Sequence, residues 1–245
     1  MTRALGFWSA IACAAMSIAF LGGTALAAVA LPANVWTGDI RAFAASFTPW
    51  PMLLGVVPSV LIAPTFLGLI AAIHGQTSAE RKPLMLFALA LATVYAAIVV
   101  VNYFLQLTVV RLGLESGRTD GLALLLMENP TGAFWPMEAL GYGVQGLAAG
   151  VAATAFAGGG LARWVRTLFL VVGAGGVLSL AAGVRGVSFT DPVFILGGAA
   201  WGIAFPLGTA LAALYFQRSG DRTPDGEPAA PVSRPARLAA ATDGK

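Results

Sequence analysis

The sequence is poor in charge and in the residue types that bind metals or form disulfides. Its 245 residues include 14 Lys and Arg and 11 Asp and Glu, 10% of the chain, whereas about a quarter of a soluble domain is charged. The single cysteine, Cys13, excludes an intramolecular disulfide and a thiolate metal cluster. The single histidine, His74, excludes multi-histidine haem sites and HExxH zinc sites. We therefore expect no metal and no cofactor.

Hydrophobic residues dominate the sequence instead. Hydrophobic residues make up 58% of the sequence, and the mean hydropathy is +0.82. A soluble chain of this length could not hide so much apolar surface, because most of its exterior must face water. This composition excludes an ordinary soluble enzyme, a disordered protein and a nucleic-acid binder. It indicates an integral membrane protein whose first partner is the lipid bilayer.

Six segments are long and apolar enough to cross a bilayer core of about 30 Å, which takes about 20 helical residues. They are approximately Leu5–Leu31, Met52–Ile73, Leu84–Val110, Met137–Gly158, Val165–Val184 and Pro192–Phe216. Backbone groups in hydrocarbon must form hydrogen bonds within their own segment, so we expect helices. The predicted fold is all-α, a polytopic bundle of six transmembrane helices over residues 1–216, followed by a disordered, proline-rich cytoplasmic tail over 217–245.

The distribution of basic residues predicts the orientation of this bundle. Ten Lys and Arg fall on the side of the two termini, and four fall on the opposite side: Arg41, Arg111, Arg118 and Arg185. Cytoplasmic loops carry the excess of positive charge, so both termini are expected in the cytoplasm. An even number of spans requires the same arrangement.

The first span has an alternative interpretation as a cleaved signal peptide. It has a short basic start and contains Ala25-Leu26-Ala27, a small-residue pattern that resembles a cleavage site. Its apolar run is much longer than the roughly 7–15 residues of a signal-peptide core, which favours a retained span. Cleavage would leave five spans and an outside N-terminus.

Glycines recur at spacings that let helix backbones approach closely. The pattern includes Gly146 with Gly150, Gly198 with Gly202, and the cluster Gly173, Gly175 and Gly176. Such glycines usually hold a protein's own bundle together, and an oligomer interface is the alternative. The loop between the third and fourth spans carries a short apolar run, 122–127, which we expect to lie at the interface or to fold back over the bundle as a lid.

Polar side chains form two stripes on consecutive spans. The third span carries Tyr95, Asn102 and Gln106, and the fourth carries Glu138, Tyr142 and Gln145. At 100° per residue each set lies on one narrow helix face, and the two sets lie at matching depths toward the outer side. They either hydrogen-bond across the helices as structural contacts or line an outer cavity. No charged residue lies near the centre of a span, which disfavours a proton relay, a voltage sensor or an ion pump.

The segments Asn102-Tyr103-Phe104-Leu105-Gln106-Leu107-Thr108 and Leu140-Gly141-Tyr142 resemble a family of multi-pass bacterial membrane proteins. The resemblance covers the membrane portion and not the tail. The family has no established activity, so the resemblance implies no catalytic or binding residues.

Three functional hypotheses follow from the polar stripes. The first is a non-catalytic protein of a bacterial cytoplasmic (inner) membrane, with an outer-leaflet cavity between spans three and four that binds a lipid or small amphiphile. Its polar end would be oriented by Asn102, Gln106, Glu138, Tyr142 and Gln145. The second is a small transporter or transporter subunit, whose second and sixth spans are kinked by proline. The third is an intramembrane enzyme that uses Glu138 as general acid or base, which requires that side chain to be buried.

Overall fold

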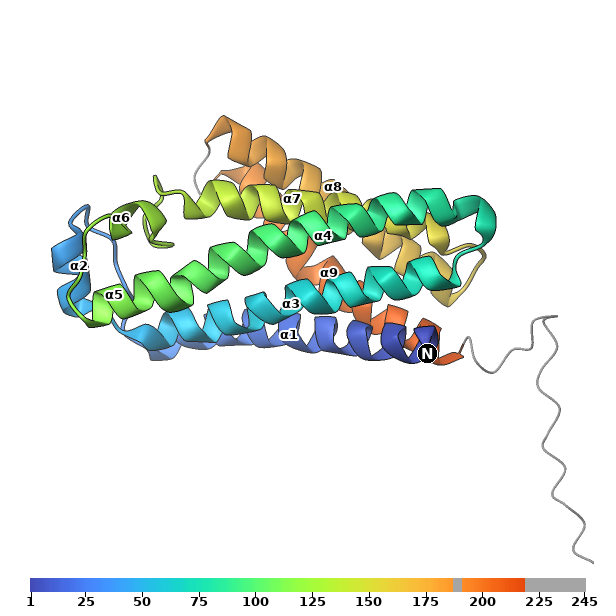
Figure 1. Ribbon diagram of the computed structural model, residues 1–245, viewed down its shortest axis with the longest axis horizontal. Coiled ribbons are helices and arrows are strands. Elements are labelled where there is room, and N and C mark those ends of the chain that lie inside the picture. The colour runs from blue at the N-terminus through green and yellow to red at the C-terminus, as the bar shows by residue number, and fades with distance from the viewer. Residues whose placement is uncertain (187–190, 219–245) are drawn as a thin grey trace, which may run out of the picture.

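A computed structural model describes residues 1–186 and 191–218, and the secondary structure of these residues is helical. The helices that run along the molecule are α1 (Thr2–Ala30), α3 (Pro49–Gln76), α4 (Lys82–Leu105), α7 (Phe134–Ala152), α8 (Leu161–Arg185) and α9 (Pro192–Arg218) (Figure 1). The shorter elements are α2 (Ile40–Ser46), α5 (Arg111–Glu115), α6 (Leu122–Leu125), the 3₁₀ turns η1 (Ala79–Arg81) and η3 (Ala153–Ala155), and the π-helical turn η2 (Gln106–Val110). Of the expected disordered tail, residues 219–245 lie outside the described residues.

Within the described residues, five helices are long and apolar enough to cross a membrane. They are α1, α3, the continuous stretch Ala79–Glu115 that contains α4, α8 and α9. The expectation of an all-helical, multi-pass membrane protein is therefore confirmed at this level. The remaining long helix, α7, is not among the five; it has 19 residues and includes Glu138 and Gln145, both buried.

The bounds of α7 differ from those of the expected fourth span. The helix begins at Phe134 rather than at Met137, because Pro136 lies in the first turn, where its missing N–H needs no partner. It ends at Ala152, and the 3₁₀ turn η3 leads on to the glycines 158–160.

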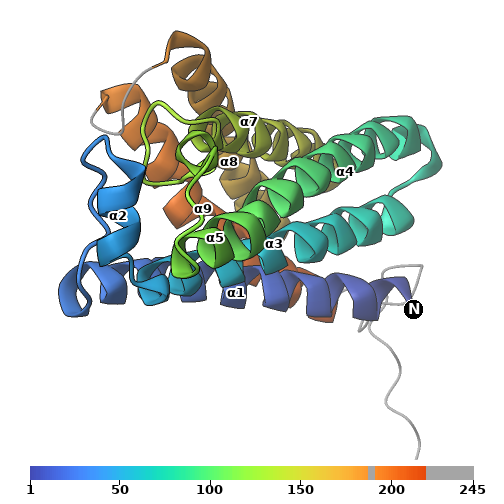
Figure 2. The same cartoon turned by 60° about the vertical axis from the view of Figure 1, so that its left-hand side comes forward.

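The long helices form a closed ring in chain order. Each packs against the next, from α1 through α3, α4, α7 and α8 to α9, and α9 packs against α1. Arg3 closes the ring at one end, where its guanidinium donates to the carbonyls of Phe216 at 2.9 Å and Gln217 at 2.6 Å. The start of α1 and the end of α9 therefore lie at the same end of the molecule, while Figures 1 and 2 place α2 and α5 at the opposite end.

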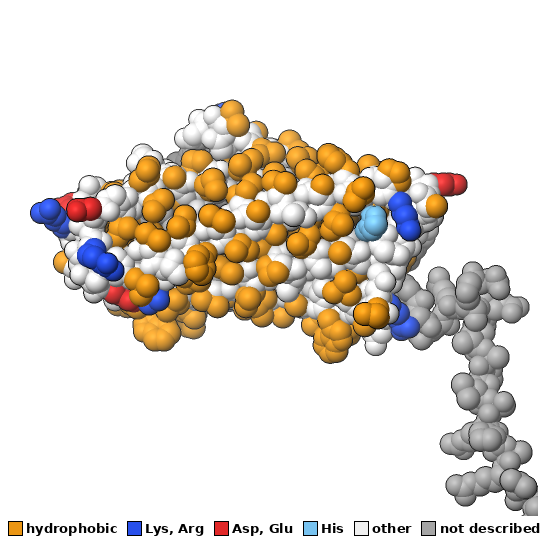
Figure 3. Space-filling model, viewed as in Figure 1, with side chains coloured by type: hydrophobic (Ala, Val, Ile, Leu, Met, Phe, Trp, Pro, Cys, Tyr) orange, Lys and Arg blue, Asp and Glu red, His pale blue; other side chains and the backbone are white. Residues whose placement is uncertain are grey.

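Charge and hydrocarbon are separated along this axis. Figure 3 shows apolar side chains over the middle of the visible face and charged side chains gathered at the two ends. Many of the exposed side chains on the long helices are large and apolar, for example Ile18, Leu86 and Ile203, each more than half exposed. An apolar surface of this kind between two charged ends fits a hydrocarbon solvent.

Glycines bring α7 and α8 into backbone contact. A Cβ added to Gly146 would lie 2.6 Å from the Gly176 Cα, and one added to Gly173 would lie 3.1 Å from the Gly150 Cα. The expectation that these glycines pack the bundle is confirmed. It was wrong for Gly198 and Gly202 of α9, because their missing side chains face open space or, for Gly202, only Leu21 at 3.7 Å.

Candidate ligand cavity

The two polar stripes meet across the contact between α4 and α7. Asn102 Nδ2 donates to Glu138 Oε1 at 2.8 Å and to the Phe134 carbonyl at 3.3 Å. The Tyr103 hydroxyl donates to Glu138 Oε2 at 2.7 Å and lies 3.4 Å from the hydroxyl of Tyr142. Asn102 and Glu138 are 5% and 7% exposed. Both carboxylate oxygens therefore have a neutral donor inside the bundle.

Gln106 fixes the connection between α6 and α7. Its side chain donates to the Leu125 carbonyl at 2.7 Å and accepts from the Met127 N–H at 3.3 Å. The indole N–H of Trp135 donates to the Met127 carbonyl at 2.7 Å. These bonds satisfy backbone groups of an irregular segment, which could otherwise not be buried against the bundle without cost. The 122–127 run is thus folded back against the helices.

Burial raises the pKa of one acidic side chain in the connection between α6 and α7. Glu128 lies outside the long helices, and burial raises its pKa from 4.5 to about 7, while a hydrogen bond with the Asn34 side chain lowers it. Its Oε2 atom is buried without a hydrogen-bond partner. The neutral acid is accordingly favoured relative to an exposed glutamate.

Gln145 of α7 points to a different neighbour. Its Oε1 accepts from the indole N–H of Trp201 at 2.8 Å, which links α7 to α9. Its Nε2 is buried without a partner, as is the hydroxyl of Tyr95.

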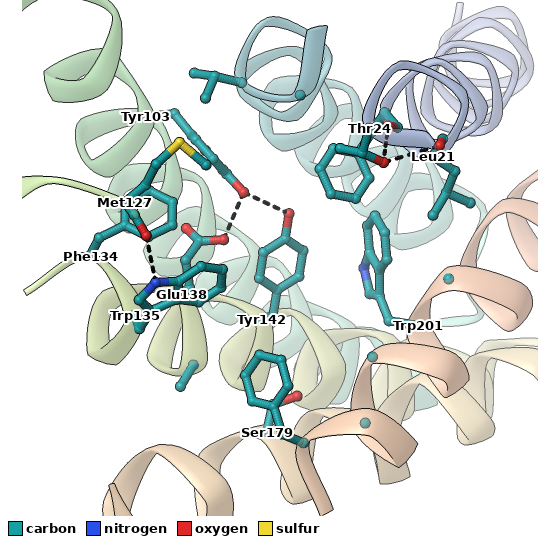
Figure 4. Close-up of a pocket in the computed structure, with 18 of the residues that line it drawn as sticks. Leu21, Thr24, Tyr103, Met127, Phe134, Trp135, Glu138, Tyr142, Ser179 and Trp201 are labelled. Atoms are coloured by element: carbon teal, nitrogen blue, oxygen red, sulfur yellow. Dashed lines mark hydrogen bonds between the residues drawn. The ribbon is translucent and has the colours of Figure 1, made fainter. Parts of the chain in front are cut away.

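A cavity of about 380 Å³ lies inside the ring of helices (Figure 4). Its lining residues come from the last part of α1 and the first parts of α3, α7 and α9, which lie at the end of the molecule opposite the N-terminus (Figure 1). Its walls come from α1, α3, α4, α7, α8, α9 and the connection before α7. They comprise Phe20, Leu21, Thr24, Pro51, Gly55, Val56, Tyr103, Met127, Phe134, Trp135, Glu138, Ala139, Tyr142, Ser179, Phe194, Gly197, Gly198, Trp201 and Gly202. Leu21 of α1 is 38% exposed, and Gly198 of α9 is exposed as well. The cavity therefore reaches the surface between α1 and α9.

Aromatic rings close the bundle on the side of the cavity toward the N-terminal end. Trp201 packs edge-on against Tyr142, with ring centroids 5.1 Å apart, and stacks on Phe205 at 5.5 Å. Phe66 joins this layer to both Phe205, at 5.6 Å, and Tyr95, at 5.7 Å. The layer crosses the ring of helices from α9 to α4, and two of its rings, those of Tyr142 and Trp201, line the cavity and form its floor.

The structure separates the five expected site residues into two groups. Glu138 and Tyr142 line the cavity. Asn102, Gln106 and Gln145 do not line it, and instead bond to Glu138, to the loop and to Trp201. The cavity is not confined to the contact between spans three and four. It lies inside the ring of helices, with walls from α4 and α7 and also from α1, α3, α8 and α9.

Sequence reasoning missed the contributions of Tyr103 and Trp201. Tyr103 follows Asn102 directly, and its phenol bonds to the same glutamate. Trp201 is the tryptophan that lies well inside an expected span, away from the headgroup zone where tryptophans are enriched. Its position inside a span, away from the headgroup zone, was the signal that could have identified Trp201 as a site residue. The glycine face of α9 carried a second signal, because small side chains leave room for a cavity.

The structure limits the ion pairs, metal sites and ionisable groups that could act at this cavity. Arg111 pairs with Glu115 at 3.1 Å, and not with Glu138. Within residues 1–186 and 191–218, no group of three His, Cys, Asp or Glu side chains is placed to hold a metal ion. The ionisable groups of the cavity wall are Glu138 and the phenols of Tyr103 and Tyr142.

Comparisons of the chain with protein-family models, curated proteins and solved structures found no match. Functional inference therefore depends on the geometry of the cavity.

Proposed function

We propose that the chain crosses a bacterial cytoplasmic (inner) membrane six times, with α7 as the fourth span and both termini in the cytoplasm. The course of α7 along the long axis, like that of its neighbours, supports the sixth span (Figure 1). The bacterial assignment rests on the resemblance around Asn102.

Charge at the two ends supports the orientation. Among the described residues, the end with the N-terminus carries six Lys and Arg and one Glu: Arg3, Glu80, Arg81, Lys82, Arg163, Arg166 and Arg218. The opposite end carries four Arg and five acidic residues: Asp39, Arg41, Arg111, Glu115, Arg118, Asp120, Glu128, Arg185 and Asp191. The positive-inside rule then assigns the first end to the cytoplasm.

The function we propose is non-catalytic binding of a lipid or small amphiphile in the outer half of the bundle. The cavity carries this proposal. Its volume of about 380 Å³ falls in the usual range of small-molecule sites, about 300–1,000 Å³. Its wall is mostly apolar, and Glu138 with the hydroxyls of Tyr103 and Tyr142 supplies a polar group in that wall. A chain entering between α1 and α9 would come directly from the bilayer.

The aromatic floor favours binding over transport. A transporter needs a path from the cavity to the cytoplasmic side, and the layer that contains Phe66, Trp201 and Phe205 fills the middle of the bundle. A transporter role would require this layer to move.

An intramembrane enzyme is the second candidate, because Glu138 is buried and faces the cavity. Apart from Glu138, the ionisable groups that line the cavity among the described residues are the phenols of Tyr103 and Tyr142, which are neutral near pH 7. Neither a second carboxylate nor a basic side chain of this part of the chain lies beside Glu138 in the wall. We therefore favour a binding protein.

Native mass spectrometry of the full chain released from maltoside micelles tests the binding proposal. The wild-type protein should retain a co-purified lipid or amphiphile. Gly202→Leu should abolish retention, because the new side chain extends from a cavity wall where an added Cβ meets only Leu21. Gly22→Leu is the matched control, since Gly22 is an exposed glycine of α1 outside the cavity wall, with nothing within 4 Å of an added Cβ. Equal ligand retention by the wild type and both variants contradicts the proposal.

A further inference from the structure

The charge of the cavity wall is unbalanced. Among the described residues, Glu138 is the one carboxylate in the wall, and no Lys, Arg or His of this part of the chain lines it. Within the described ranges the ion pair found is that of Arg111 with Glu115 at the end of the bundle. The donors that reach Glu138 are the neutral groups of Asn102 and Tyr103. A carboxylate has about four acceptor positions, so it has capacity for a further donor from the cavity.

Aromatic rings make up much of the rest of the wall. Seven of the lining residues are aromatic: Phe20, Tyr103, Phe134, Trp135, Tyr142, Phe194 and Trp201. Figure 4 shows Trp135 and Trp201 on opposite sides of the cavity, with Glu138 and Tyr142 between them. Contacts among the rings fix their positions: Trp135 packs against Phe134 with centroids 5.1 Å apart, and Trp201 packs against Tyr142 at the same distance.

An acidic side chain among aromatic rings favours a positively charged ligand. The faces of Trp, Tyr and Phe attract a cation within about 6 Å, most strongly where water is excluded, and cages of such rings recognise quaternary ammonium groups. A carboxylate among the rings adds to that attraction, because a cation bound beside it stabilises the charged form of the acid. An anionic head group would instead meet the negative faces of the rings and would oppose the charged form of Glu138. A neutral alcohol would gain only a hydrogen bond.

We propose that the cavity binds a lipophilic ammonium, with the charged amine against the Glu138 carboxylate and between the aromatic side chains, and with the apolar part extending toward the opening between α1 and α9. This inference rests on the proposed function and specifies the chemistry of the ligand. The ammonium belongs either to a free alkylamine or to the head group of a membrane lipid.

Titration calorimetry of the full chain in uncharged maltoside micelles tests the preference with three probes that share a decyl chain. The probes are decyltrimethylammonium, decanol and decanoate. The cation should bind at least about tenfold more tightly than decanol, and decanoate should bind most weakly. Added phosphatidylethanolamine that competes with the cation would assign the ammonium to a lipid head group, and lack of competition would assign it to a free amine.

Glu138→Gln isolates the role of the charge. The amide keeps the size of the side chain, and its oxygen still accepts from Asn102. It should lower the affinity for decyltrimethylammonium by about tenfold or more, and it should lower the affinity for decanol by a smaller factor. A cooperative thermal unfolding transition in the same micelles shows that the variant is folded.

Two results separate this inference from the proposed function. Equal affinity of the wild type for the three probes, or unchanged cation binding by Glu138→Gln, overturns ammonium recognition. The binding cavity itself still stands if Gly202→Leu abolishes the binding of every probe. Unchanged binding of all three by Gly202→Leu overturns both.

Discussion

At the scale of single residues, the contact between Asn102 and Glu138 determines where the polar groups of α4 and α7 point. Each side chain is buried and satisfies the other at 2.8 Å. Asn102 thereby holds the carboxylate, while the opposite side of Glu138 faces the cavity. We therefore regard Asn102 as a positioning residue and not as a ligand contact.

Asn102→Leu should destabilise the protein, because it removes the donor to a buried carboxylate oxygen. We expect a loss of about 1–3 kcal/mol in unfolding free energy. Adding Glu138→Leu should recover part of that loss, since both polar partners are then replaced by apolar groups. Denaturant unfolding in mixed micelles measures both. Strictly additive destabilisation by the two substitutions would show that the contact contributes nothing.

Glu128 should make the connection between α6 and α7 sensitive to pH. Its pKa is raised by burial to about 7 in the folded protein, from 4.5. Because the folded state holds the proton more tightly, its contribution to stability is complete below about pH 4.5 and is lost as the pH rises through about 7. Amide hydrogen exchange over residues 122–133, corrected for intrinsic rates, should be faster at pH 8 than at pH 5. In Glu128→Gln this difference should vanish; a difference of the same size in both proteins would assign it to another group.

At the scale of helices, glycine decides how closely α7 approaches α8. Gly146→Ala should be strongly destabilising, because its Cβ would lie 2.6 Å from the Gly176 Cα, a backbone atom that cannot rotate away. We expect a cost of about 1–3 kcal/mol. Gly150→Ala is the matched comparison on the same helix, since its Cβ would meet the Gly173 Cα at an ordinary 3.6 Å. Thermal unfolding in detergent should rank wild type and Gly150→Ala together, above Gly146→Ala. The reverse order would contradict the packing described for this pair of helices.

Side-chain hydrogen bonds, and not helix packing alone, hold the connections between the helices. The π-helical turn η2 begins at Gln106, whose side chain holds the backbone of the next connection. An irregular turn at such a position is a common feature of functional sites. Here it places the amide so that Met127, at the end of the 122–127 run, and Trp135 line the cavity.

At the scale of the whole molecule, features that depend on the local sequence could be predicted. Features that depend on contacts between distant parts of the chain could not. Helical character and the shared face of Asn102 and Gln106 follow from hydropathy and from 100° per residue, which are local properties. The position of the cavity inside the ring depends on α9 packing against α1, at the two ends of the chain. No local pattern encodes that closure. Glu138 and Tyr142 were therefore predicted at the cavity, whereas Trp201 and the α1 wall were not.

The ring of helices also explains why one half of the bundle is filled and the other is hollow. Large rings such as Phe66 and Phe205 occupy the middle of the bundle, while glycines line α9 beside the cavity. A ligand of the right length would complete the packing of the outer half. Its binding should therefore raise the thermal stability of the bundle by mass action.

The most direct test of the central claim is a density map of the full chain in a lipid nanodisc at a resolution that shows side chains. We expect elongated density in the cavity, with one end at Glu138 between Trp135 and Trp201 and the other at the opening between α1 and α9. A map of the same quality in which side chains fill this space, or in which α1 and α9 close against each other with nothing between them, would contradict the account.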